Sequence, residues 1–136
     1  PNNDLGSNDV LKAFSKFNGH KNIKIYPSIR FEYFLVLLKN ADFIIGNSSA
    51  GIREAPYYGI PTINIGTRQN NRAKAESIIN CDYEKKEIDK SLKLLSGVKV
   101  EALREFGEGN SDKLFLKTLN NDRFWDTSKQ KTFIEL

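Results

Sequence analysis

The sequence predicts an α/β fold in which helices flank a parallel β-sheet. Short apolar, β-branched runs alternate along the 136 residues with longer segments whose apolar residues recur at helical spacing. Residues 61–65, Pro-Thr-Ile-Asn-Ile, have the composition of a strand that is buried on both faces. Residues 43–58 pass from an apolar run through a small polar turn into a helical pattern. This alternation is typical of a parallel sheet covered by helices.

The N-terminal part of the chain predicts two strands and three helices after a turn-rich entry. Ser7 can cap a helix that ends at Gly19, because the apolar residues between them fall at helical spacing. A short strand over residues 22–26 and a second helix beginning at Pro27-Ser28 are expected next. The strand of residues 43–46 then leads through the polar turn into a third helix, which stops at Gly59.

The C-terminal part predicts two further strands and several helices. The strand of residues 61–65 is followed by a polar loop, and a second strand is expected over residues 77–81. Helical patterns cover residues 84–95, 99–106 and 111–120, the last with Ser111 as its cap. The tail of residues 121–136 is expected to be helical in part. We expect residues 1–136 to form a single domain.

Composition excludes several classes of protein. A content of 28% charged and 39% hydrophobic residues is ordinary for a globular chain. No apolar stretch approaches the roughly 18 residues that a membrane helix needs, so we expect no membrane partner. The 21 basic and 17 acidic residues are spread along the chain, and a net charge of +4 without a basic tract predicts no nucleic-acid partner.

Cysteine and histidine are too scarce for a metal centre. Cys81 is the single cysteine, which excludes an internal disulfide and fits a reducing compartment, so we expect a cytoplasmic protein. His20 is the single histidine, and no cluster of metal ligands is readable. We expect neither a metal nor a cofactor.

The chain has no methionine and begins with Pro1, without a signal sequence or a strand before it. A complete reading frame begins with methionine. We therefore expect a piece of a longer protein, whose domain has its first strand before Pro1; processing at an internal site is the alternative.

The turn Asn47-Ser48-Ser49 has the features of a phosphate-binding site. The first N–H groups of a helix have no partner within the helix, and the helix dipole places partial positive charge there. Ser48 and Ser49 add two hydroxyl donors, while Gly46 and Gly51 keep side chains away from an approaching ligand. The alternative is that a serine here is only a helix cap and a glycine only part of a turn.

Two further side chains can complete a nucleotide site. Glu54 lies about five residues into the helix, where its carboxylate could accept hydrogen bonds from ribose hydroxyls. Asn2, the two serines and Arg68 each follow a strand, so parallel strands would bring them to one edge of the sheet. The guanidinium of Arg68 suits a phosphate. The alternative is a solvated arginine on a surface loop.

Two blocks of sequence resemble a known family. Residues 46–55 (Gly-Asn-Ser-Ser-Ala-Gly-Ile-Arg-Glu-Ala) and residues 58–69 (Tyr-Gly-Ile-Pro-Thr-Ile-Asn-Ile-Gly-Thr-Arg-Gln) resemble the C-terminal half of UDP-N-acetylglucosamine 2-epimerases, particularly the hydrolysing kind. The resemblance covers most of residues 1–82. It implies the second Rossmann-like domain of a glycosyltransferase-B-type enzyme, which would form its site with a preceding N-terminal domain and tend to form homo-oligomers.

The resemblance also implies roles for individual residues. Ser48 and Ser49 would hold the diphosphate of UDP, Glu54 the ribose hydroxyls and Arg68 the nucleotide side of the site. Asn2 would lie against the ligand, and the backbone near Tyr26 would meet the uracil.

The family reaction implied by the resemblance is an elimination. A base removes the proton at C2 of UDP-N-acetylglucosamine, UDP departs to leave a glycal, and water addition yields N-acetylmannosamine on the path to sialic acids. The acids and bases belong mostly to the other domain, so this stretch alone is expected to have no catalytic residue and no activity. The alternatives are a non-hydrolysing epimerase, a nucleotide-sugar transferase and a non-catalytic nucleotide-binding module.

Overall fold

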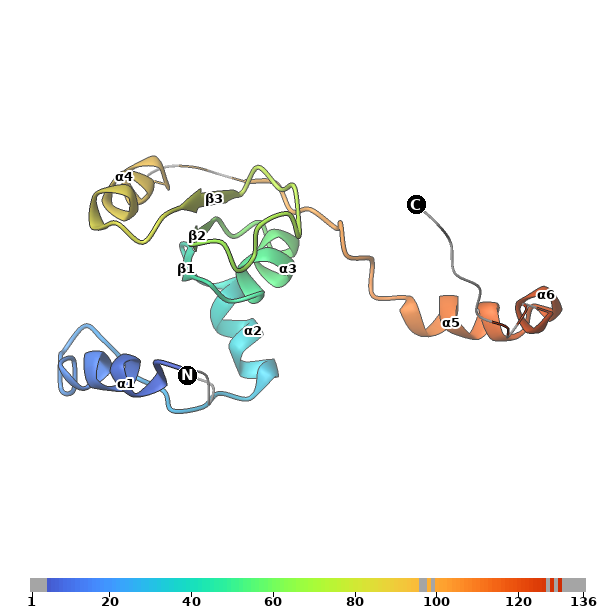
Figure 1. Cartoon of the computed structure of the whole chain (residues 1–136), viewed down its shortest axis with the longest axis horizontal. Helices are drawn as coiled ribbons and strands as arrows, with labels where there is room; N and C mark the ends of the chain where they lie inside the picture. The colour runs from blue at the N-terminus through green and yellow to red at the C-terminus, as the bar shows by residue number, and fades with distance from the viewer. Residues whose placement is uncertain (1–4, 96–97, 99, 127, 129, 131–136) are drawn as a thin grey trace. The chain divides into compact units, whose positions relative to one another are not determined.

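The computed structural model describes residues 5–95, 98, 100–126, 128 and 130 (Figure 1). Contacts within the chain divide it into two compact units, residues 1–37 and residues 38–136. The expectation of one domain over residues 1–136 stays a prediction. No helix among the described residues is both long enough and apolar enough to cross a membrane.

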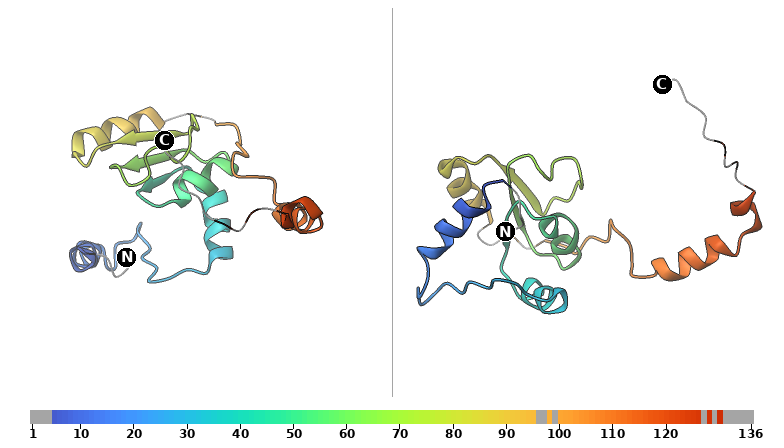
Figure 2. Two further views of the ribbon diagram at one scale, coloured as in Figure 1. Left: turned by 45° about the vertical axis from the view of Figure 1, so that its right-hand side comes forward. Right: turned by 60° about the horizontal axis from the view of Figure 1, so that its bottom comes forward.

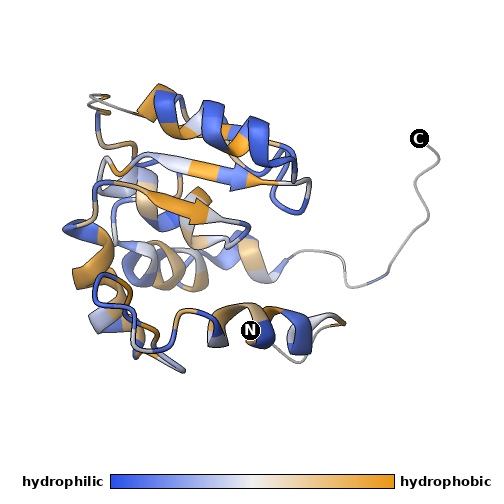
Figure 3. Ribbon diagram, turned by 90° about the vertical axis from the view of Figure 1, so that its left-hand side faces the viewer, coloured by the Kyte–Doolittle hydropathy of each residue, from blue (hydrophilic) through white to orange (hydrophobic). Residues whose placement is uncertain are grey.

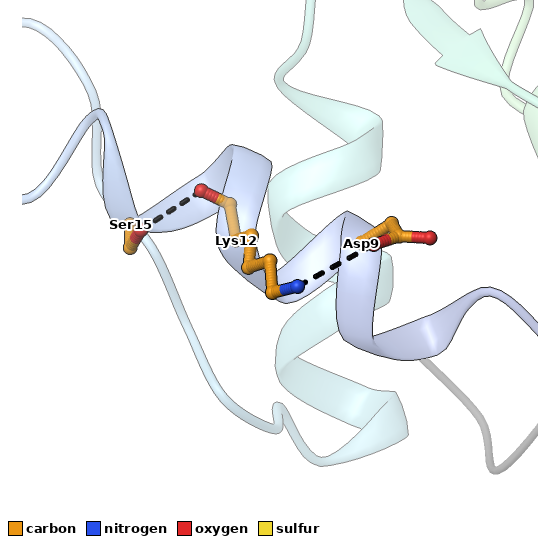
Figure 4. Close-up of polar contacts among 3 residues, drawn as sticks. All are labelled: Asp9, Lys12 and Ser15. Carbon is orange, nitrogen blue, oxygen red and sulfur yellow. Dashed lines mark hydrogen bonds and ion pairs between the residues drawn. The ribbon is translucent and has the colours of Figure 1, made fainter.

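The first unit begins with helix α1 (Ser7–Ser15). Gly6, rather than Ser7, is the residue that caps this helix, because the Gly6 carbonyl accepts the N–H groups of Asp9 and Val10 at 3.0 and 3.2 Å. Two contacts along one face support the helix, and Figure 4 shows both. Lys12 Nζ lies 3.8 Å from Asp9 Oδ1, and the Ser15 hydroxyl donates to the Lys12 carbonyl at 2.8 Å.

The strand expected over residues 22–26 is wrong, because these residues form no strand. A strand is stabilised by pairing with a neighbouring backbone, and Ile23 and Ile25 remain 39% and 40% exposed. Helix α2 (Phe31–Lys39) follows, a few residues later than Pro27-Ser28. Its first bond runs from the Phe34 N–H to the Arg30 carbonyl, and its buried residue is Leu38.

A three-stranded parallel sheet forms the centre of the second unit. Its strands are β1 (Ile44–Gly46), β2 (Thr62–Ile65) and β3 (Ile78–Cys81), in the order β1-β2-β3. The register pairs Gly46 with Asn64 and Asn64 with Asn80. Figure 2 shows the strands side by side. The predicted fold class, a parallel sheet with flanking helices, is confirmed.

Two helices cover the sheet and close its core. Helix α3 (Ala50–Tyr57) packs on β1 and β2, and helix α4 (Lys85–Leu95) packs on β2 and β3. Figure 3 shows the strands between these two helices. Apolar burial makes the greatest contribution to such a core, and its most buried members are Leu38, Ile52, Ala55, Ile60 and Ile63.

The helix expected over residues 99–106 is wrong for its described part, residues 100–106. The Leu103 N–H donates instead to the Pro56 carbonyl at 2.8 Å. That carbonyl lies in the last turn of α3, where it also accepts the Gly59 N–H at 3.1 Å. The long-range bond therefore takes the N–H that a local helix would have used.

Helices α5 (Ser111–Leu119) and α6 (Asp122–Trp125) complete the described chain. Asn110, and not Ser111, occupies the capping position of α5. The Trp125 indole N–H donates to the Leu119 carbonyl at 2.8 Å and ties the two helices together. The tail is thus helical over α6, while residues 127, 129 and 131–136 lie outside the described residues.

Candidate functional site

Four of the six predicted site residues lie in the second unit. Ser48 and Ser49 form the turn between β1 and α3, Glu54 lies on α3, and Arg68 lies in the loop after β2. Tyr26 belongs to the first unit, and Asn2 lies outside the described residues.

The turn after β1 and the loop after β2 share one edge of the sheet. Because β1 and β2 run parallel, their carboxyl ends meet there. A hydrogen bond joins the two segments, from Gln69 Nε2 to the Asn47 carbonyl at 3.0 Å. The convergence expected of Ser48-Ser49 and the Arg68 loop is therefore present in the fold.

Most helix N–H groups at this turn already have partners. The N–H groups of Gly51 and Ile52 donate to the carbonyls of Ser48 and Ser49 at 3.2 and 3.0 Å, and the Ala50 N–H donates to Ser48 Oγ at 3.3 Å. This corrects the expectation that the first helix amides are free. Among the described residues, the N–H groups of Ser48 and Ser49 have no partner, and both residues are exposed. These two N–H groups and the two hydroxyls are the donors that the turn offers.

The two glycines of the turn have different roles. Gly46 has a φ of 144°, and apart from its two chain neighbours no described residue has an atom within 4 Å of where a Cβ would stand, so the backbone there is open to a ligand. A Cβ on Gly51 would lie 2.6 Å from Thr62 Cγ2 and 3.6 Å from Ile44 Cγ2. Gly51 therefore allows α3 to approach the sheet, rather than a ligand to approach α3 as the sequence led us to expect.

Glu54 is half-buried on the flank of α3. It lines a groove of about 430 Å³ with Tyr58, Leu103 and Phe106. The guanidinium of Arg53 lies 5.6 Å from the centre of the Phe106 ring and forms part of the wall. A carboxylate beside tyrosine hydroxyls and aromatic faces can accept hydrogen bonds from a diol.

Tyr26 is exposed and lines a separate groove of about 520 Å³. Tyr33 and Leu37 of α2 form other parts of the wall. The lining is largely apolar, which suits a planar ring.

The loop after β2 carries two arginines, Arg68 and Arg72. Within the described residues, the ion pairs within 4.0 Å involve Lys12, Arg30 and Lys85, and neither Arg68 nor Arg72. Arg68 is exposed at the edge of the sheet. A guanidinium that has no carboxylate partner in the described part of the chain, on a loop at the same sheet edge as the Ser48 and Ser49 N–H groups, favours an anion at this edge.

Gln69 is the residue of this site that sequence reasoning missed. It is 3% exposed, and its Oε1 accepts a hydrogen bond from Arg72 Nη1 at 3.2 Å. Glutamine in a polar loop is mostly solvated, so its type and position gave no signal of burial.

No metal centre is found in the part of the chain that the structure describes, since it contains no group of three or more His, Cys, Asp or Glu side chains suited to a metal. Cys81 is a free, half-buried thiol on β3.

Comparison with known proteins gives consistent matches. The sequence model of the family described as UDP-N-acetylglucosamine 2-epimerase matches residues 1–120. The chain is 49% identical, over its whole length, to 37% of a UDP-N-acetylglucosamine 2-epimerase from Neisseria meningitidis serogroup B. It is 38% identical, over 68% of its length, to 23% of a GDP/UDP-N,N'-diacetylbacillosamine 2-epimerase (hydrolyzing) from Campylobacter jejuni.

A solved structure agrees with these matches. UDP-GlcNAc 2-epimerase from Methanocaldococcus jannaschii superposes with a TM-score of 0.66 and 25% identity, covering 85% of this chain and 34% of that one. The chain thus spans only about a third of the length of such relatives. A family match over residues 1–120, near-half identity and a shared fold lead to one conclusion: the chain belongs to the UDP-N-acetylglucosamine 2-epimerase family.

Proposed function

We propose that this chain is the UDP-binding part of a hydrolysing UDP-N-acetylglucosamine 2-epimerase. The complete protein would convert UDP-N-acetylglucosamine to N-acetylmannosamine and UDP for the synthesis of sialic-acid-type sugars, in the cytoplasm. The observation that carries the proposal is the exposed Ser48-Ser49 turn, whose two N–H groups have no partner among the described residues, joined by a hydrogen bond to the arginine loop at the same sheet edge. Relatives described as hydrolyzing epimerases favour the hydrolysing reaction.

Each predicted site residue has a part in this proposal. Ser48 and Ser49 bind the diphosphate through their N–H groups and hydroxyls, and Arg68 adds a cation on the nucleotide side. Glu54 accepts hydrogen bonds from the ribose hydroxyls. Asn2 contacts the ligand, and the backbone at Tyr26 contacts the uracil.

The contribution of these residues to the reaction is stabilisation of the leaving group. As the bond between C1 and the β-phosphate oxygen breaks, negative charge grows on that phosphate. Donors that are already in place stabilise this charge without reorganising. The acids and bases that act at C2 would come from another part of the protein, so the 136-residue chain alone would bind UDP weakly and catalyse nothing. Self-association of the complete protein is part of the proposal.

The experiment is an assay of the complete protein with UDP-N-acetylglucosamine. We expect free UDP and N-acetylmannosamine in equal amounts. A sugar that stays attached to UDP would point to a non-hydrolysing epimerase, and transfer of the sugar to an acceptor would point to a transferase. Absence of any product despite tight UDP binding would favour a non-catalytic module.

A double variant, Ser48→Ala/Ser49→Ala, tests the proposed site. We expect kcat/KM to fall about 100-fold, the size of effect seen when transition-state donors are removed. Ser77→Ala is the matched control, because the Ser77 hydroxyl is buried and has no partner among the described residues. Normal turnover by the double variant would contradict the proposed roles of both serines.

A further inference from the structure

We propose that Gln69 is a positioning residue that holds the Ser48 N–H in place to bind a nucleotide diphosphate, and that Arg72 acts through it. This inference rests on the proposed function, since it concerns the same anion-binding turn. It adds two residues to which neither the sequence motif nor the comparisons assign a role.

The burial of Gln69 requires an explanation. A buried glutamine loses side-chain freedom, and its amide must be hydrogen-bonded to be tolerated. Gln69 meets this requirement with two specific bonds, one from its Nε2 to the Asn47 carbonyl and one to its Oε1 from Arg72. The Asn47 bond joins segments 22 residues apart in the sequence. Its effect is to hold the loop after β2 and the turn after β1 in one arrangement.

The hydrogen bond to the Asn47 carbonyl also affects the next residue, because this carbonyl shares a peptide unit with the Ser48 N–H. The carbonyl of residue 47 and the N–H of residue 48 belong to one planar peptide unit and point in opposite directions. A donor that fixes this carbonyl therefore fixes the direction of the Ser48 N–H, which has no partner among the described residues. Gln69 thus orients one of the donors offered to the ligand without touching the ligand.

Arg72 extends the same chain of hydrogen bonds. Its guanidinium donates to Gln69, the Gln69 amide donates to the Asn47 carbonyl, and the peptide unit ends in the Ser48 N–H. All donors in this series of hydrogen bonds point in the same direction along it. Hydrogen bonds connected head to tail in this way polarise one another. Arg72 has no carboxylate partner within the described residues. Its charge therefore strengthens the Ser48 N–H as a donor to an anion.

The test compares UDP with uridine, which lacks phosphate. Dissociation constants of both are measured by calorimetry on the complete protein and on Gln69→Met, which keeps the side chain's size but removes both bonds. We expect UDP to bind about 10-fold more weakly, the loss of about one hydrogen bond to a charged group, while uridine binding changes less than about 2-fold. A merely structural role would weaken both ligands alike.

Arg72→Met supplies a second readout, with the exposed cation Lys74 as a charge-matched control. In the otherwise unaltered protein, we expect Arg72→Met to weaken UDP binding more than Lys74→Met does. In a protein that already carries Gln69→Met, we expect Arg72→Met to cause no greater further loss of UDP affinity than Lys74→Met causes. If Gln69→Met does not fold, the comparison of Arg72→Met with Lys74→Met carries the test.

The outcomes separate the two proposals. Equal affinity of the unaltered protein for uridine and UDP would overturn both the diphosphate site and this inference. A normal preference for UDP that survives Gln69→Met would overturn this inference alone. Fully additive losses for Gln69→Met and Arg72→Met would overturn the claim that Arg72 acts through Gln69.

Discussion

Replacing Gly51 with alanine tests how closely α3 must approach the sheet. The new methyl group would stand 2.6 Å from Thr62 Cγ2, well inside van der Waals contact. Thr62 is 2% exposed, and its hydroxyl donates to the Gly51 carbonyl at 2.7 Å. A β-branched side chain has few rotamers, so rotating the methyl away would break this hydrogen bond. The clash must be relieved by moving α3 or by losing the bond.

The magnitude follows from opposing effects on the free energy of unfolding. Overpacking a core costs about 1–3 kcal/mol, and losing the Thr62 bond costs about 1 kcal/mol. Alanine improves helix propensity by at most about 1 kcal/mol, and less in a first turn. We expect Gly51→Ala to destabilise the protein by about 2 kcal/mol. Thr62→Ser removes the opposing methyl, keeps the hydroxyl and costs about 1 kcal/mol alone.

Urea unfolding of the complete protein measures these changes as shifts of the transition midpoint at constant slope. In Gly51→Ala/Thr62→Ser the alanine methyl enters the space that the threonine methyl has left. We expect the double variant to lose about 1 kcal/mol, rather than the sum of about 3 kcal/mol. Unchanged stability of Gly51→Ala, or simple additivity in the double variant, would refute the close contact.

Three further predictions concern the stability of the second unit. Ile63→Ala should cost about 3 kcal/mol in urea unfolding, because Ile63 is fully buried, while Ile45→Ala at a 42% exposed position should cost less than about 1 kcal/mol; equal losses would contradict the core. Asn64→Asp should lower the melting temperature far more than Asn64→Leu, because it buries a carboxylate where Asn64 Oδ1 has no partner among the described residues; the reverse order would contradict this account. Gly66→Ala should cost about 2 kcal/mol, because Gly66 has a φ of 75° that alanine adopts only with strain, whereas the exposed Tyr83 side chain near the added Cβ can move aside; a neutral result by thermal unfolding would contradict this strain.

Local patterns were sufficient where a segment's structure depends on its own residues. The strands at 43–46, 61–65 and 77–81 and the helix at 84–95 appear within one residue of their expected bounds. Two segments of good local pattern failed. Residues 22–26 place Ile23 and Ile25 between polar residues, as a strand would, but pair with no neighbouring strand, and the Leu103 N–H of the predicted helix bonds to the Pro56 carbonyl instead. Periodicity reports which face of a segment is apolar, and cannot report which partner competes for its backbone.

The α/β class, the strand-turn-helix around Ser48-Ser49 and the sheet edge expected for Arg68 followed from the residues alone, because periodicity, small residues and parallel topology act over short stretches. Packing in three dimensions was needed to establish that Gly51 faces Thr62 and that Gln69 is buried against Asn47. These contacts join residues 11 and 22 positions apart. Their geometry depends on how β1, β2 and α3 pack, and no local pattern encodes it.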